Sequence, residues 1–286
     1  MSVILENINY TYSPGTPFEH KALDNVSLKI ATGSFTGLIG HTGSGKSTLI
    51  QHLNALVKPD SGKITINGTD ITADGVSLSD VRKKVGLVFQ YPEYQIFEET
   101  IAEDIAFGPS KLNLSKEEIN ERVREAMEMV GLNYEEKKDK SPFDMSGGQK
   151  RRVAIAGILA MRPEVLILDE PTAGLDPGGR EEILKEIDAI HKRTHNTVIW
   201  VSHSMDDVSR FVDNLIVMNK GKIEFVGKPS AIFQHEKRMT EIGLGVPKAV
   251  ELANILNDKG WHIPHDVLTI EDILPYIISE RGKTRA

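Results

Sequence analysis

The chain has 286 residues, of which 40% are hydrophobic and 26% are charged, so it can bury a large core and widespread disorder is excluded. It has no cysteine, which excludes disulfides, thiolate nucleophiles and cysteine-ligated metal sites. Its 34 Lys and Arg against 41 Asp and Glu give a net charge of −7, which argues against a nucleic-acid partner. No apolar run reaches the length of about 20 residues that crosses a bilayer. The first residues do not resemble a signal peptide, so we expect a cytoplasmic protein.

The first thirty residues alternate apolar and polar side chains, a pattern of period two that is typical of antiparallel strands. Residues 13–17 contain two prolines and a glycine, which cannot continue a strand, so we expect a loop there. The chain is therefore predicted to open with an antiparallel β part.

Strands and helices then alternate up to about residue 228, which predicts an α/β fold with a mainly parallel sheet. The apolar run at residues 165–168 is typical of a strand buried on both faces. We expect strands at residues 35–40, 63–66, 85–89, 165–168, 197–201, 215–218 and 222–226, and helices at residues 46–56, 115–129 and 146–161.

The last part of the chain, residues 229–286, is predicted to be a helical extension of a domain that spans residues 1–228. Helices are expected at residues 246–257 and 269–279. Ser115 with Glu118, and Thr269 with Asp272, have the spacing of capping boxes at helix starts.

A glycine-rich stretch after the predicted strand 35–40 matches the phosphate-binding P-loop pattern G-x-x-x-x-G-K-[ST]. Its backbone N–H groups and the following helix N-terminus favour an anion, Lys46 would reach the β- and γ-phosphates, and Ser47 would offer its hydroxyl to Mg²⁺. The alternative is a plain strand-to-helix turn. We expect the nucleotide to contact Gly40, His41, Thr42, Gly43, Ser44, Gly45, Lys46, Ser47 and Thr48.

Two carboxylates, Asp169 and Glu170, follow the apolar strand 165–168. This position faces a P-loop at the carboxyl edge of a parallel sheet. Asp169 would hold Mg²⁺, and Glu170 would be the general base that polarises the attacking water. Without the P-loop, the pair would equally fit two ordinary solvated acids.

A second candidate phosphate site lies at the predicted helix start Ser146, Gly147, Gly148 and Gln149, where small residues leave backbone N–H groups exposed. One γ-phosphate does not need two sets of backbone N–H groups from the same chain. The second set would therefore serve a nucleotide held by another subunit. By itself, the tetrapeptide would also fit a simple helix cap.

Together, the P-loop, Met145-Ser146-Gly147-Gly148-Gln149, Leu168-Asp169-Glu170-Pro171-Thr172 and the later His203 resemble the nucleotide-binding subunits of ATP-binding cassette proteins. The resemblance covers residues 1–228 in the family's order and spacing and implies a helical subdomain at about residues 91–161. Met145 stands where the family usually has leucine, a change that conserves volume.

The resemblance implies further roles in ATP binding and hydrolysis. Tyr12 is similar to the aromatic that stacks on adenine, although a strand aromatic can also be a core residue. Gln90 resembles the glutamine that contacts Mg²⁺ and the attacking water, and Asp176 resembles part of a loop that crosses a dimer interface. His203 resembles the histidine that holds the γ-phosphate and orients Glu170.

Residues 91–109 and the helical tail resemble the second, A-prime type of ATPase in energy-coupling factor transporters of prokaryotes, which take up vitamins and transition-metal ions. This resemblance implies a heterodimer with a second cassette ATPase, a transmembrane coupling subunit bound near residues 90–97, and a substrate-binding membrane protein. It also implies a peripheral position at the cytoplasmic face of the membrane, with the tail contributing to dimerisation.

Several alternatives remain open at this stage. Residues 91–109 could shape the groove of another importer, such as a cobalt/nickel or conventional permease system, and a homodimer is possible. A chromosome-associated ATPase would need a long coiled-coil insertion, and a translation-associated one would need two cassettes. A small P-loop kinase would need an arginine-rich lid. The sequence shows none of these three features.

Overall fold

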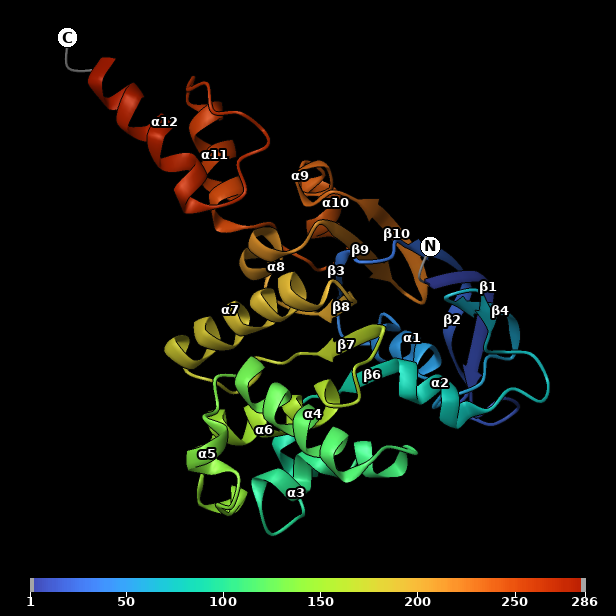
Figure 1. The fold of residues 1–286 in the computed structure, drawn as a ribbon. Coiled ribbons are helices and arrows are strands. Elements are labelled where there is room, and N and C mark those ends of the chain that lie inside the picture. The colour runs from blue at the N-terminus through green and yellow to red at the C-terminus, as the bar shows by residue number, and fades with distance from the viewer. Residues whose placement is uncertain (1–2, 284–286) are drawn as a thin grey trace.

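The structure is a computed structural model that describes residues 3–283. Residues 1–2 and 284–286, which belong to the two expected units, lie outside the described residues. Figure 1 shows two sheets with helices around the larger one and a pair of helices that extends away from the body.

The N-terminal sheet is antiparallel, as the alternating pattern predicts. Its strand order is β2-β1-β4-β5. Val3, Leu5 and Ile8 of β1 are buried, so one face of this sheet packs on the core. The strands are β1 (Val3–Tyr12), β2 (His20–Ile30), β4 (Ser61–Ile66) and β5 (Thr69–Asp70).

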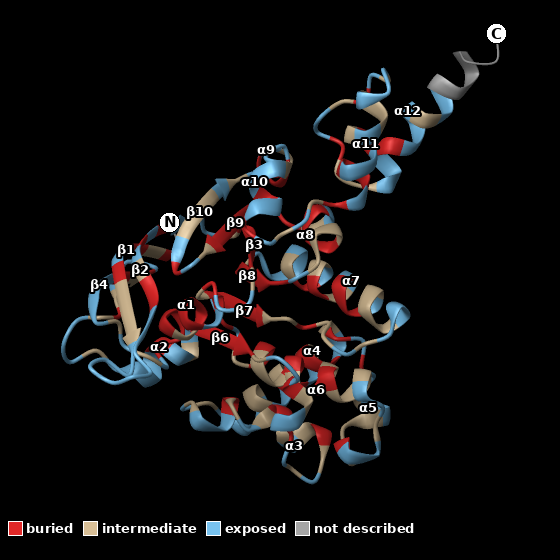
Figure 2. Cartoon of the chain, turned by 180° about the vertical axis from the view of Figure 1, so that it is seen from behind, coloured by how far each residue is buried: buried red, intermediate tan, exposed pale blue. Residues whose placement is uncertain are grey.

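The central sheet is mainly parallel, which confirms the predicted fold class. Its order is β10-β9-β3-β8-β7-β6, and only the edge pair β10–β9 is antiparallel. Every residue of β3 and β8 is buried, and so are the four apolar residues of β7, which explains the continuous apolar run at residues 165–168 (Figure 2). The strands are β3 (Phe35–Gly40), β6 (Val85–Val88), β7 (Val165–Asp169), β8 (Thr197–Val201), β9 (Asn214–Asn219) and β10 (Lys222–Gly227).

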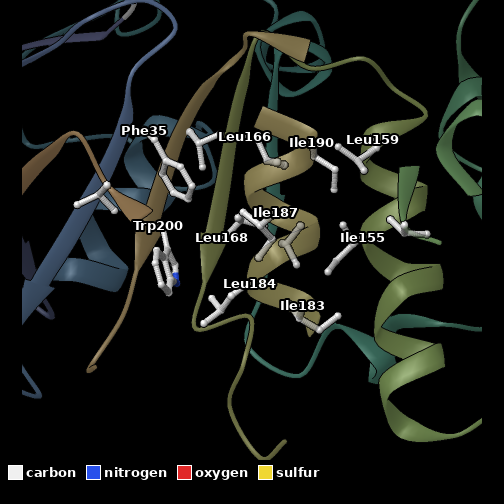
Figure 3. Close-up of a cluster of buried hydrophobic side chains, with 14 of the residues drawn as sticks. Phe35, Ile155, Leu159, Leu166, Leu168, Ile183, Leu184, Ile187, Ile190 and Trp200 are labelled. Carbon is white, nitrogen blue, oxygen red and sulfur yellow. The ribbon is translucent and has the colours of Figure 1, made fainter. Parts of the chain in front are cut away.

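Helices α3, α4, α5 and α6 gather on one side of the central sheet (Figure 1). Helix α7 packs between the sheet and α6: Ile183 and Ile187 point into a core that contains Leu168 of β7 and Ile155 of α6 (Figure 3). The helices up to β9 are α1 (Lys46–Leu53), α2 (Leu78–Lys84), α3 (Ile101–Ala106), α4 (Lys116–Met129), α5 (Tyr134–Lys137), α6 (Gly147–Leu159), α7 (Pro177–Thr194) and α8 (Met205–Phe211). Short 3₁₀ turns are η1 (Pro92–Gln95), η2 (Pro109–Lys111) and η3 (Pro142–Asp144).

Two local predictions need correction. The helix expected at residues 46–56 ends at Leu53, because Ala55 adopts a left-handed φ of 52° that a right-handed helix cannot contain. The capping box expected from Ser115 and Glu118 is half formed: the Ser115 hydroxyl accepts from the Glu118 N–H, but the Glu118 carboxylate pairs with Arg122 at 2.8 Å instead.

The chain after β10 forms α9 (Pro229–Ile232), α10 (Glu236–Glu241), α11 (Lys248–Asp258) and α12 (Ile270–Lys283). Ile232 and Phe233 belong to the large core beside the central sheet, whereas α11 and α12 enclose a small separate core that contains Ala253 and Ile273. The reciprocal hydrogen bonds between Thr269 and Asp272 confirm the capping box at α12. Among residues 3–283, no helix has the length and apolar character to cross a membrane.

Candidate active site

The P-loop follows β3 and ends at the first turn of α1, as the pattern predicts. Gly40 and Gly45 are both required by close packing. A Cβ on Gly40 would collide with Ser44 and with the Met218 carbonyl, and a Cβ on Gly45 would lie 2.6 Å from the Ala22 carbonyl oxygen. Gly45 also has a φ of 102°, a conformation that other residues rarely adopt. The loop therefore curls tightly at the sheet edge.

Lys46 is buried at the base of this loop. Its Nζ donates to the Gly40 carbonyl at 2.6 Å and to the His41 carbonyl at 3.2 Å. Burial lowers the pKa of Lys46, while Glu170 and Asp169 act in the opposite direction. The two carbonyls thus hold the ammonium group where an anion in the loop would meet it.

A pocket of about 520 Å³ lies above the P-loop. It brings together residues that are distant in the sequence, from the N-terminal sheet, the P-loop and the ends of central strands. Its lining consists of Tyr12, His20, Ala22, Thr42, Gly43, Ser44, Gly45, Lys46, Ser47, Thr48, Gln90, Glu170 and His203.

Glu170 lies between two polar side chains in this pocket. Its Oε2 accepts a hydrogen bond from Gln90 Nε2 at 3.2 Å, and its Oε1 lies 2.7 Å from His203 Nε2. The residue has a left-handed φ of 50°, which is strained for glutamate and is stabilised only by surrounding contacts. One such contact joins the Glu170 N–H to the Val201 carbonyl at 3.1 Å. This carboxylate can accept a proton from a water in the pocket.

Asp169 ends β7 beside Glu170 but does not line the pocket. Burial raises its pKa to about 6, the Glu170 charge adds to the rise, and Lys46 and His203 oppose it. With Ser47 and Gln90, Asp169 offers the oxygen donors that Mg²⁺ prefers. The part of the chain that the structure describes has no cluster of three or more acidic or histidine residues that could hold a metal ion alone. The donor set therefore fits an ion that is also held by phosphate oxygens and water.

Tyr12 ends β1 at the rim of the pocket. Its ring packs edge to face on Tyr10, with centroids 4.8 Å apart, and its hydroxyl lies 3.3 Å from Thr48 Oγ1. The residue is 37% exposed, so part of the ring is open to a planar ligand and Tyr12 is not a core aromatic. The strand pairing of Tyr12 with His20 also brings His20 into the pocket, a residue that the sequence did not single out.

Other expected site residues lie outside this pocket. His41 turns its ring toward Asn219, at 3.2 Å, and contributes its carbonyl to Lys46. Ser146 caps α6, where its hydroxyl accepts from the Gln149 N–H and the Gln149 side chain accepts from the Ser146 N–H, both at 3.3 Å. The residues Ser146, Gly147, Gly148 and Gln149 are exposed or half-buried and do not line the pocket.

Asp176 caps α7 and is also exposed. Its carboxylate accepts a hydrogen bond from the Gly179 N–H at 3.2 Å. Thr172 and Arg180 flank it and line a second hollow of about 460 Å³, which also contacts Glu170 and His203. Part of the segment after Glu170 thus lines a hollow that also reaches the general-base candidate.

The P-loop, the buried lysine and a carboxylate held between an amide and an imidazole define the class of P-loop nucleotide hydrolases. A family model described as ABC transporter matches residues 23–173. The energy-coupling factor transporter ATP-binding protein EcfA2 of Clostridium tetani is 58% identical over 271 residues, which cover 95% of this chain and 94% of that protein.

Solved structures of ATP-binding cassette proteins agree with the family match. The structure of cbiO1 from Clostridium perfringens, part of the ABC transporter complex cbiONQ, gives a TM-score of 0.75 at 37% identity and covers 89% of this chain and 98% of that one. The dimeric structure of a post-hydrolysis state of the ATP-binding cassette MJ0796, bound to ADP and Pi, gives a TM-score of 0.69 at 31% identity. This match covers 79% of this chain and 98% of that one. The chain belongs to the ABC transporter family, within its group of energy-coupling factor transporter ATP-binding proteins.

Proposed function

We propose that the chain is the ATP-binding and hydrolysing subunit that powers uptake of vitamins or other micronutrients by an energy-coupling factor transporter. The observation that carries this proposal is the Glu170 carboxylate, held by Gln90 and His203 beside the P-loop. The near full-length similarity to EcfA2 supports the type of transporter. The transported substrate would be selected by a separate membrane protein.

In the proposed reaction, the P-loop N–H groups and Lys46 hold the phosphates of ATP, and Tyr12 contacts adenine. Glu170 accepts a proton from the attacking water, while Gln90 and His203 keep the carboxylate in place. Mg²⁺, held by Ser47, Gln90 and Asp169, would neutralise phosphate charge.

The nucleotide site is proposed to be shared between two cassette subunits that pack head to tail, with a heterodimer favoured. The exposed helix N-terminus at Ser146, and the exposed Asp176, support this arrangement because neither lines the chain's own pocket. Each would face the nucleotide held by the P-loop of the partner subunit. Closure on ATP and reopening after hydrolysis would then drive the attached membrane subunits.

The membrane side is proposed to be the segment that follows Gln90. Tyr94 is 83% exposed and Phe97 is 57% exposed, which is unusual for large aromatic side chains and fits a site that a helix of the coupling subunit covers. The chain would then be peripheral at the cytoplasmic face of the membrane. The exposed apolar residues Ile270, Leu274 and Ile278 of α12 support a dimerisation role for the extension at residues 229–286.

Purification of the tagged chain from its native membranes in mild detergent tests this proposal. We expect a second cassette ATPase, a transmembrane coupling subunit and small membrane proteins to be recovered with ATPase activity. The variant Tyr94→Ala/Phe97→Ala should lose the membrane proteins and keep the ATPase partner, whereas Phe18→Ala, which removes a ring that is 84% exposed elsewhere, should keep both. Recovery of a pair of large permease subunits would indicate a conventional importer, and recovery of no membrane protein would refute a transport role.

A further inference from the structure

Arg151 is a buried charged residue that the nucleotide pocket does not explain. It lies on α6, shortly after the Ser146 cap, and is only 1% exposed. A buried guanidinium is costly unless its N–H groups are all paired with suitable acceptors. The partners of Arg151 therefore indicate what the residue does.

One side of the guanidinium binds Glu93 of η1 through two parallel hydrogen bonds. Arg151 Nε donates to Glu93 Oε2 at 3.1 Å, and Arg151 Nη2 donates to Glu93 Oε1 at 2.8 Å. Glu93 follows Gln90 closely in the chain and is itself largely buried, with a side chain 15% exposed. This bidentate pair fixes the segment that carries Gln90 against α6.

The other side of the guanidinium binds the segment that carries Glu170. Arg151 Nη1 donates to the Pro171 carbonyl at 3.0 Å and to the Ala173 carbonyl at 2.8 Å. These carbonyls follow directly after Glu170, whose own carbonyl accepts from the Ala173 N–H at 3.0 Å. Arg151 therefore joins the two backbone segments whose side chains meet in the Gln90–Glu170 hydrogen bond.

Both segments contain a residue with a strained backbone, either next to the group that faces the pocket or at that group itself. Tyr91, next to Gln90, has a φ of 55°, and Glu170 has a φ of 50°. The Tyr91 ring also packs closely against Gly174 of the segment that carries Glu170. A Cβ atom added to Gly174 would lie only 3.2 Å from Tyr91 Cε1. Such conformations persist where surrounding contacts determine them, and Arg151 provides four of these contacts.

We propose that Arg151, paired with Glu93, is a positioning residue that fixes the general base Glu170 relative to Gln90 and links both to helix α6, which begins at the Ser146 cap. This inference rests on the proposed function, since it assigns Arg151 to the hydrolysis step of that reaction. Arg151 and Glu93 do not line the nucleotide pocket, so their contribution is to turnover and not to ATP binding. Because α6 begins at the Ser146 cap, Arg151 also connects the partner's nucleotide to this chain's own base.

Arg151→Lys is the informative substitution because it keeps the charge and most of the volume but cannot form the planar fork to Glu93. In the assembled transporter complex, we expect kcat to fall about 10- to 100-fold, as for a small displacement of a catalytic group. The KM and Kd for ATP should stay within about twofold. Glu93→Gln should reproduce this loss, and the double variant should lose little more than either single variant because both act through one contact.

Arg162→Lys is the control, because Arg162 makes an arginine–glutamate contact of 2.8 Å to Glu125 that is remote from both segments. Its turnover should match the wild type. An Arg151→Lys kcat equal to that of the control, or a fall in kcat accompanied by an equal rise in the Kd for ATP, would overturn the proposal.

A second measurement separates this proposal from the proposed function. Hydrogen–deuterium exchange of the isolated full chain should be faster in Arg151→Lys than in Arg162→Lys at residues 90–95 and at residues 170–175, with α1 unchanged. This result is expected even if the wild-type complex hydrolyses no ATP, an outcome that would refute the proposed function alone. Equal exchange of both segments in the two variants would refute the role of Arg151.

Discussion

Replacement of Glu170 by glutamine tests the proposed general base with almost no change in shape. The Glu170 carboxylate accepts from Gln90 Nε2 at 3.2 Å and lies 2.7 Å from His203 Nε2. An amide at this position can keep both contacts, because its oxygen can accept from Gln90 Nε2 while its NH₂ group donates to the unprotonated ring nitrogen of a neutral imidazole. The substitution therefore removes the basic oxygen and leaves the pocket in place.

The expected loss follows from that geometry. A positioned general base contributes about 10²- to 10⁴-fold to a rate, which corresponds to about 2.7 to 5.4 kcal/mol in the barrier. Lys46 and the P-loop are untouched, so the Kd for ATP should stay within about threefold of the wild-type value. Because hydrolysis reopens the proposed dimer, Glu170→Gln should accumulate the closed, ATP-bound dimer.

The assay is phosphate release by the assembled complex, with ATP binding and the size of the dimer measured on the same samples. Glu164→Gln is the control, because Glu164 lies next to the opposite end of β7 and pairs with Lys84 at the surface at 3.9 Å. Its turnover should equal that of the wild type. Normal turnover in Glu170→Gln would refute the assignment of the base, and loss of ATP binding would show that the residue acts on affinity.

Three further predictions concern neighbouring groups. Lys46→Ala removes a charge-assisted contact to phosphate worth about 1.5 to 3 kcal/mol, so ATP affinity measured by titration calorimetry should fall at least about tenfold, and unchanged affinity would contradict the P-loop role. His203→Ala should lower kcat about 10²- to 10³-fold in steady-state assays, and an unchanged rate would show that another residue holds the γ-phosphate and orients Glu170. The raised pKa of Asp169, about 6, means that its carboxyl is protonated below that pH, so the affinity for ATP with Mg²⁺ should decrease as pH falls through 6. Asp169→Asn should remove this pH dependence. If the affinity of the Asp169→Asn variant still decreased below pH 6, Asp169 would not be the titrating group.

The sequence predicts the local parts of the site well because they depend on short-range rules. The P-loop glycines, the apolar run of β7 and the Ser146 cap of α6 follow from spacing and residue type. Helix ends do not follow from such rules: the left-handed backbone of Ala55 shortens α1, and no feature of the alanine side chain indicates this conformation.

The long-range parts could not be predicted from residue patterns alone. Gln90, Glu170 and His203 meet because β6, β7 and β8 are neighbours in the central sheet, and strand order is a property of the whole fold. His20 enters the pocket only through the pairing of β2 with Tyr12. In the sequence, Arg151 is one of several basic residues at the start of α6. Its buried contacts are apparent only from the structure.

The most direct test of the account is the turnover of the purified full chain as the second cassette ATPase is added at constant total ATP. A shared site needs the Lys46 loop of one subunit and the Ser146 helix of the other at each nucleotide. We therefore predict slow hydrolysis by the chain alone, a rise in turnover that saturates with the partner, and no rise when this chain carries Glu170→Gln and the partner carries the matching substitution. A turnover per chain that is high at dilution and independent of the partner would contradict a shared site.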